Sequence, residues 1–283
     1  MKSIPAGLQT HYDTRTTTTA WALKITRTDA AVYAFTSAQR NVELSGVTYL
    51  SAPGLLVKDF VTSAGLQVDN TELTILPDDA LITLADILAG RWNNAAWQLW
   101  RYNWANPSNG VEAINRGLLG ELQPRAGAYV AELRGLQQYL QQPIGSPSTK
   151  TCRARLGDAR CTKVLTSFTF TGTLTSVTSQ QTVTDSGRSE AADYFGDGSI
   201  TWLTGDNSGL THKVKTHATG GVLTLAAPAI YTLQVGDTYS IVAGCRKRLD
   251  EDCITKFNNV LNFQGEPHRP TLDDLTKAPE VNV

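Results

Sequence analysis

The sequence is poor in cysteine, methionine and net charge. Its 283 residues include four cysteines and one methionine, and its 25 basic residues are matched by 26 acidic ones, giving a net charge of -1. A chain so evenly balanced has no overall field that attracts nucleic acid or a membrane surface. We therefore expect no sequence-specific binding of nucleic acid, and partners that are recognised locally.

Long apolar runs are also missing. Apolar residues make up 41% of the chain, but no run approaches the roughly 20 residues of a membrane-spanning helix, so we expect no membrane span. The first five residues, Met1 to Pro5, lack the apolar core of a secretory signal. This predicts a soluble protein that folds in a reducing cytosol, where disulfides are disfavoured.

Motifs of catalysis are not found either. The four histidines, at positions 11, 212, 217 and 268, are scattered, and no two have a metal-ligand spacing. The sequence has no glycine-rich phosphate loop and no Gly-x-Ser-x-Gly turn. Isolated carboxylates such as Glu132 and Asp193 are usually solvated or paired. We predict no catalytic residues and a protein that is not an enzyme.

What the sequence does contain is β-strand pattern. Apolar and polar residues alternate in several segments, which predicts half-buried strands and a β-rich domain over residues 1–150, barrel-like in form. These segments are 21–27, 31–35, 42–50 with a turn at Gly46, 65–76, 97–104, 118–122 and 128–134. Residues 80–88 have helical spacing and precede Gly90, which predicts one short helix.

Tryptophan is concentrated in one part of this domain. Four of the six tryptophans lie between positions 92 and 104. Such a cluster can bind sugar rings, but aromatic side chains on both faces of a strand more often fill a core or a subunit interface.

A second β-rich region follows. Residues 167–242 are rich in threonine and serine, and strands are expected near 167–177, 200–203, 210–214, 222–225 and 239–242. We predict a separate, inserted all-β module. Its loop residues Asp193, Asp197, Asp206 and Asn207 lack the spacing of a known calcium loop, so ordinary turn chemistry is the favoured interpretation.

The four cysteines form two close pairs on either side of this module. Eight residues separate Cys152 from Cys161, and seven separate Cys245 from Cys253. We predict a small four-cysteine subdomain made of residues 151–166 plus 243–283. An iron–sulfur cluster, a zinc ion and two disulfides all remain open, although zinc usually prefers closer pairs and a cubane accepts irregular spacing. Neighbouring basic residues, Arg153 and Lys247 among them, are expected to favour the thiolates.

Several sequence blocks, in one order, resemble the tail-tip and baseplate hub proteins of long-tailed bacteriophages and of the related gene transfer agents. The blocks are Ile25 to Asp29, Ala89 to Ala95, Asn103 to Pro107, Glu132 to Leu136, Cys152 to Cys161, and Gly244 to Pro267. The cysteine spacing is similar to that in the tail-tip protein L of phage lambda. Two departures stand out: Ala30-Ala31 occupies a place where relatives tend to have glycine, and Ser37 to Arg40 lacks an expected His-Asp pair.

The resemblance implies a structural virion protein, made in the host bacterial cytoplasm, that takes part in DNA ejection. It implies a homotrimeric hub that closes the tail tube and joins the distal tail protein to the central tip or fibre protein, with the tape-measure protein as a further candidate partner. It also implies that Cys152, Cys161, Cys245 and Cys253 hold a structural [4Fe-4S] cluster, with zinc as the alternative.

Two other functions are considered. One is a receptor- or carbohydrate-binding tail protein that uses Trp100 or Trp202, and the other is a tail-associated cell-wall hydrolase.

Overall fold

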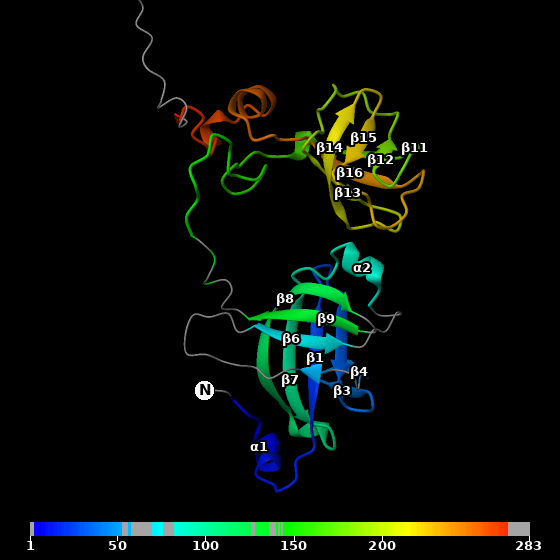
Figure 1. Ribbon diagram of the computed structural model, residues 1–283, viewed down its shortest axis with the longest axis vertical. Coiled ribbons are helices and arrows are strands. Elements are labelled where there is room, and N and C mark those ends of the chain that lie inside the picture. Colours follow the sequence, from blue (N-terminus) through cyan, green and yellow to red (C-terminus); the bar gives the residue numbers. More distant parts are fainter. Residues whose placement is uncertain are drawn as a thin grey trace, which may run out of the picture. The chain divides into compact units, whose positions relative to one another are not determined.

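The computed structural model describes residues 3–52, 56–57, 70–75, 82–125, 128–135, 140, 142 and 144–270. The chain divides into two compact units, Met1–Pro143 and Ile144–Val283. Both are built mainly of strands (Figure 1), so the predicted mainly β fold is confirmed. Within the described residues no helix is long and apolar enough to cross a membrane.

The first unit contains one sheet of nine strands, in the order β3-β4-β2-β1-β7-β8-β9-β6-β5. The strands are β1 (Thr19–Thr26), β2 (Val32–Thr36), β3 (Val42–Leu44), β4 (Val47–Ser51), β5 (Leu56–Val57), β6 (Asn70–Ile75), β7 (Ala96–Asn103), β8 (Val111–Arg125) and β9 (Ala128–Gly135). The sheet curls (Figure 1), but its end strands β3 and β5 do not pair with each other in the described part of the chain. The described residues thus form a curled sheet, and closure into the predicted barrel-like form is not shown among them.

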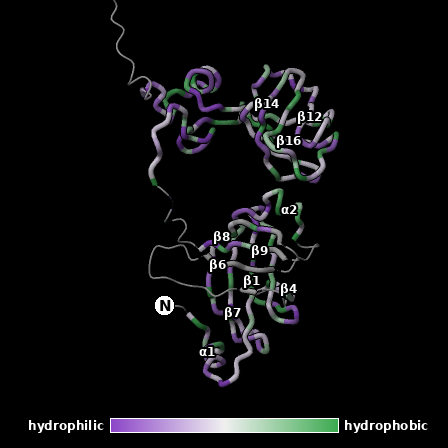
Figure 2. The backbone as a smooth tube through the Cα atoms, in the orientation of Figure 1, coloured by the Kyte–Doolittle hydropathy of each residue, from purple (hydrophilic) through white to green (hydrophobic). Residues whose placement is uncertain are grey.

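Strand β1 is central because both of its faces are buried. Trp21, Leu23 and Ile25 pack into one hydrophobic cluster, and Ala20 and Ala22 pack into another. Alternate side chains of a strand point to opposite faces, so the sheet carries a core on each side of β1. Hydrophobic and hydrophilic residues are correspondingly interspersed along the strands (Figure 2).

Two of the four tryptophans between positions 92 and 104 fill a core, as expected. Trp92 and Trp97 are 2% and 1% exposed and belong to one core cluster. Trp100 is half-buried and lies edge-on to Tyr49, with ring centroids 6.3 Å apart. Trp104 is the exposed member.

Helices in this unit are short. They are α1 (Ala6–Tyr12), α2 (Leu84–Leu88) and the 3₁₀ turn η1 (Pro107–Asn109). The predicted helix over 80–88 is therefore shorter at its start, where Thr83 caps it by accepting a hydrogen bond from the backbone N–H of Asp86 at 3.1 Å. Residues 80–81 of that prediction, and residues 65–69 and 76 of the predicted strand 65–76, lie outside the described residues.

The second unit contains a sheet of seven strands, in the order β10-β16-β13-β14-β15-β12-β11. The strands are β10 (Thr169–Thr173), β11 (Ser176–Val177), β12 (Thr182–Thr184), β13 (Ser199–Trp202), β14 (Thr211–Ala218), β15 (Val222–Leu225) and β16 (Thr238–Val242). Alternate residues such as Ile200, Trp202, Tyr239 and Ile241 are fully buried in one core. The predicted module over 167–242 thus has its own hydrophobic centre, and β12 is a strand that the sequence pattern did not reveal.

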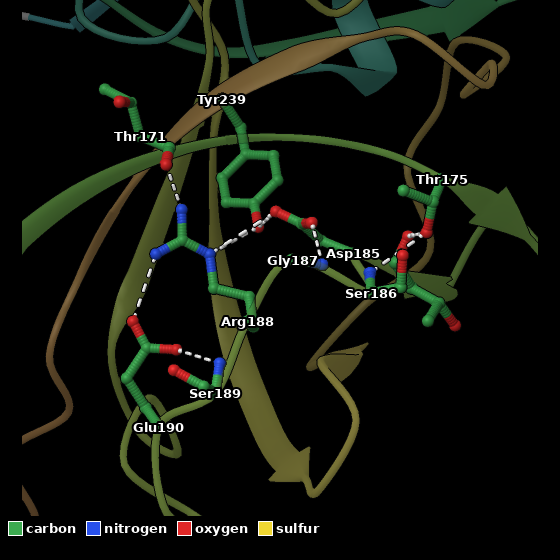
Figure 3. A network of polar contacts seen from close by, with 10 residues as sticks. Thr171, Thr175, Asp185, Ser186, Gly187, Arg188, Ser189, Glu190 and Tyr239 are labelled. Atoms are coloured by element: carbon green, nitrogen blue, oxygen red, sulfur yellow. Dashed lines mark hydrogen bonds and ion pairs between the residues drawn. The ribbon is translucent and has the colours of Figure 1, made fainter.

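A polar network is buried against this core (Figure 3). The Tyr239 hydroxyl donates to Asp185 at 2.6 Å, and Arg188 Nε donates to the Tyr239 hydroxyl at 3.2 Å. Arg188 also donates to Glu190 at 3.1 Å and to the carbonyl oxygen of Thr171. Burial of the hydroxyl and its bond to Asp185 raise the Tyr239 pKa. Because every charged group has an opposite partner, this network can stay away from water.

In their described residues the cysteine segments have only short helical elements. They contain the 3₁₀ turns η3 (Thr166–Phe168) and η5 (Val260–Asn262) and the π-helix η4 (Leu249–Lys256). These segments and the module belong to one compact unit. The separate status of the predicted subdomain 151–166 plus 243–283 stays a prediction.

Candidate metal centre

Cys161 and Cys253 are each placed by local backbone structure. Cys161 follows a turn in which the Asp158 carboxylate accepts the backbone N–H groups of Cys161 at 2.7 Å, Arg155 at 2.9 Å and Arg160 at 3.0 Å. These N–H groups lower the pKa of Asp158. Cys253 lies in the π-helix η4, a rare form that often marks functional sites.

The other two cysteines are held across the chain. The N–H of Cys152 donates to the Lys247 carbonyl at 2.9 Å, and the N–H of Arg153 donates to the Gln264 carbonyl at 3.0 Å. Cys245 comes three residues after β16. These bonds bring the segments around the two cysteine pairs side by side, although more than 80 residues separate Cys161 from Cys245.

All four cysteines line one small cavity of about 20 Å³. They are half-buried and their thiols are free, so no disulfide joins them. The walls of the cavity also include apolar side chains, among them Leu156, Phe257 and Phe263. The structure therefore brings together the four residues that the sequence singled out, and it does so as thiols.

The sulfur atoms accept or donate hydrogen bonds within this site. The backbone N–H of Gln264 donates to Cys152 Sγ at 3.4 Å, and Asn259 Nδ2 donates to Cys161 Sγ at 3.4 Å. Cys253 Sγ donates to the Asn259 carbonyl at 3.2 Å. Asn259 Nδ2 also donates to the Cys161 carbonyl at 2.7 Å. Asn259 thus links both cysteine pairs.

Burial dominates the electrostatics of two of the four thiols. Burial raises the pKa of the Cys245 and Cys253 thiols. Several neighbouring arginines are occupied by carboxylates: Arg153 pairs with Glu266 at 2.7 Å, and Arg248 pairs with Glu251 at 2.8 Å. At Cys245 desolvation outweighs the positive charge of Lys247. Whether the basic residues favour the thiolates of a metal-bound site stays a prediction.

The backbone at the site is unusual. Thr162, Lys247 and Asn258 have positive φ angles of 54°, 67° and 45°. L-residues rarely adopt this region, and such conformations cluster at ligand-binding and active sites. For a β-branched residue such as Thr162 the conformation needs support from its surroundings, which here include the Cys161 turn.

The donor set is of the kind that binds metals through sulfur, but the described residues contain no group of three or more His, Cys, Asp or Glu side chains placed to hold a metal ion. A four-cysteine metal cluster, as the predicted fold class has it, is accordingly not shown. The four thiols, the apolar walls and the N–H donors to sulfur match the surroundings that thiolate-bound clusters use. Metal binding remains a prediction that rests on this chemistry.

Sequence reasoning missed the supporting residues of this site. Asn259, Gln264 and Glu266 lie in the polar stretch after the second cysteine pair, but only the three-dimensional structure shows which thiol or arginine each contacts. Glu266 accepts two bonds from Arg153, at 2.7 and 3.0 Å. This pairing, helped by Ser148, lowers the Glu266 pKa to about 2.

The structure also bears on two other sites considered from the sequence, a glycan site at Trp202 and a calcium site in the loops of the module. Trp202 is completely buried and its Nε1 donates to His212 Nδ1 at 3.0 Å, so its ring cannot face a glycan. Arg246 pairs with Asp193, and its Nε lies 3.7 Å from Asp197 Oδ2. Asn207 is buried and donates to the Tyr231 carbonyl at 2.9 Å. The turn interpretation of this loop is thus supported over calcium binding.

Comparisons with known proteins agree with this architecture. Residues 5–164 match the family described as baseplate hub protein, N-terminal attachment domain, and residues 193–273 match the family described as phage conserved hypothetical protein BR0599. No curated protein matches the chain. A chain in the solved structure "Virion of native gene transfer agent (GTA) particle" is 34% identical, with a TM-score of 0.86, and the match covers 99% of this chain and 97% of that one.

The first match spans more than half of the sequence, and the structural match spans nearly all of it. We conclude that the chain belongs to the baseplate hub protein family and is a structural component of the tail baseplate of a phage or gene transfer agent virion.

Proposed function

We propose that the protein is a non-enzymatic, homotrimeric hub that closes the tail tube and joins the distal tail protein to the central tip or fibre protein. We further propose that Cys152, Cys161, Cys245 and Cys253 hold a [4Fe-4S] cluster of structural purpose. The observation that carries the cluster proposal is the convergence of all four thiols on one cavity in the second unit.

The cluster is favoured over zinc by the spacing of the thiols. Zinc sites usually use cysteine pairs with about two to four intervening residues, whereas eight and seven residues separate the members of the two pairs here. In a cubane each thiolate binds its own iron atom, so the sulfurs lie farther apart. When bound, the cluster supplies four strong links between segments that are far apart in the sequence.

A structural purpose follows from where those links would lie. Cys152 and Cys161 precede the module and Cys245 and Cys253 follow it, so bonds at all four fix both of its ends. The half-buried thiols and the N–H donors from Gln264 and Asn259 hold the ligands in place. A site that forms only on folding adds its binding free energy to the stability of the folded state.

Three exposed apolar side chains are candidates for burial when copies of the chain assemble. In the second unit, Ile144, Val164 and Leu261 are 102%, 72% and 95% exposed. Apolar surface of this kind is common at subunit interfaces. In a closed ring of three copies all contacts between neighbours are equivalent, so a side chain that lies at one contact is buried in every copy.

The cluster is tested by iron, sulfide and zinc content and by visible absorption of protein purified without oxygen. We expect about four irons and four sulfides per chain, both lost in Cys245→Ala. Val164→Ala is the matched control, because this exposed residue lies near Cys161 but does not line the cysteine cavity. Stoichiometric zinc, or no metal in the wild-type protein, would contradict the cluster.

The hub role is tested separately. Sedimentation of the purified chain, alone and with the distal tail protein and the central tip protein, is expected to show a trimer that binds both. The structural purpose of the cluster predicts that cysteine-to-alanine variants assemble few infectious particles. Normal, infectious tails carrying such a variant would rule that purpose out.

A further inference from the structure

A second hollow lies against Cys245. It has a volume of about 670 Å³ and is bordered by residues from the cysteine segments and from the module, all within the second unit. Leu156, Cys245 and Lys247 line both this hollow and the smaller cysteine cavity. Of the four cysteines, all of which are described, Cys245 alone lines both spaces.

The charged side chains around the hollow are mostly cationic. Arg155, Lys213 and Lys247 border it, and Asp197 is the carboxylate among its lining residues. Lys213 Nζ lies 3.4 Å from Asp197 Oδ1, but both side chains are well exposed, at 64% and 42%. An exposed pair of this kind is weak, so Asp197 offsets only part of the positive charge.

Arg155 contributes positive charge that no carboxylate at the hollow offsets. It is exposed, and its guanidinium has no carboxylate within ion-pair distance in the described part of the chain. Lys247 donates to the Ala154 carbonyl, which accepts its hydrogen bond but leaves its charge in place. A concave surface with excess positive charge concentrates small anions beside it.

We propose that this hollow is a binding and access site for small anions at Cys245, suited to carboxylates and phosphates. Val242, Leu165 and Ala243 give it apolar walls, so it also accepts the carbon skeleton of an organic anion. If the cysteines hold the proposed cluster, anionic iron carriers and chelators reach it from this side. That last step rests on the proposed function, whereas the anion site does not.

The test compares two alkylating reagents of nearly equal size on metal-free protein. Iodoacetate is an anion and iodoacetamide is neutral, and both react with the thiolate. The ratio of their rates at one cysteine therefore cancels that cysteine's thiolate fraction and its exposure, and reports the local charge. Mass spectrometry gives this ratio for all four cysteines in one sample.

We expect the iodoacetate-to-iodoacetamide ratio at Cys245 to exceed those at Cys152, Cys161 and Cys253 by about two- to fivefold at low salt. The advantage should shrink as ionic strength rises. Arg155→Gln combined with Lys213→Gln should remove most of it. Lys215→Gln is the matched control, because Lys215 is exposed on the same strand but does not line the hollow.

Equal ratios at all four cysteines in the wild-type protein would overturn the proposal, as would an equal loss in the Lys215→Gln control. The wild-type comparison and its salt dependence need no variant, so a variant that fails to fold does not decide the result. Metal content is measured independently. A protein without iron that keeps the high Cys245 ratio would refute the cluster and retain the anion site.

Discussion

Removing the Tyr239 hydroxyl tests how strongly the buried polar network holds the inserted module. In Tyr239→Phe the ring stays in the core, while one bond of 2.6 Å to Asp185 and one of 3.2 Å from Arg188 are lost. Hydrogen bonds to charged groups contribute about 1.5–3 kcal/mol each. Because both partners are charged and hardly exposed, the change is expected to cost more than a typical surface substitution.

The remaining bonds limit this cost. Asp185 still accepts the Gly187 N–H at 2.9 Å and Arg188 Nε at 3.3 Å, so its carboxylate is not left alone. Arg188 still pairs with Glu190 at 3.1 Å. We therefore expect the module's free energy of unfolding to fall by about 2 kcal/mol, near the lower part of that range.

Hydrogen exchange measured by mass spectrometry suits this prediction, because it separates the two units. A loss of about 2 kcal/mol corresponds to roughly 30-fold faster exchange of the most protected amides in strands β13 and β16. Tyr49→Phe is the control, since Tyr49 is buried in the first unit. A change below about threefold in β13 and β16, or an equal change in the control, would refute the reasoning.

Three further predictions follow from single positions. In Gly244→Ala the new Cβ would lie 1.6 Å from the Gly196 carbonyl oxygen, so we expect a loss of about 3 kcal/mol in urea unfolding. Burial lowers the pKa of His217, so the unfolded chain takes up a proton at higher pH than the folded chain. The free energy of unfolding should therefore fall as pH drops below about 6.5. Its dependence on pH should be shallower in His217→Gln and unchanged in His268→Gln. Ala30 has a φ of +65°, so Ala30→Gly should raise the melting temperature of the first unit, corresponding to about 0.5–1 kcal/mol.

Strands were the part of the fold that the sequence revealed best. The alternation of residues 21–27 and 97–104 corresponds to β1 and β7, and the turn expected at Gly46 joins β3 to β4 with a φ of +76°. Strand β12 has only three residues, Thr182 to Thr184, too few to show a period. The curl of the first sheet depends on pairing between distant strands, which local pattern does not encode.

The four cysteines could be named from the sequence because they are rare and paired. Their thiol environment could not. Whether Arg153 faces a sulfur or Glu266 is decided by a contact across 113 residues, and the bond from Asn259 to Cys161 spans 98. The two non-glycine residues with positive φ beside the cysteine pairs, Thr162 and Lys247, had no sequence signal, because neither residue type favours that conformation.

The module begins and ends on neighbouring, hydrogen-bonded strands. Thr169 of β10 pairs with Val242 of β16, and the Ala243 N–H donates to the Phe168 carbonyl at 2.9 Å. Paired antiparallel residues have Cα atoms about 5 Å apart, a gap that a short turn can bridge. Phe168 and Ala243 therefore lie at adjacent points, so the length of the stretch between them does not by itself set the distance between Cys161 and Cys245.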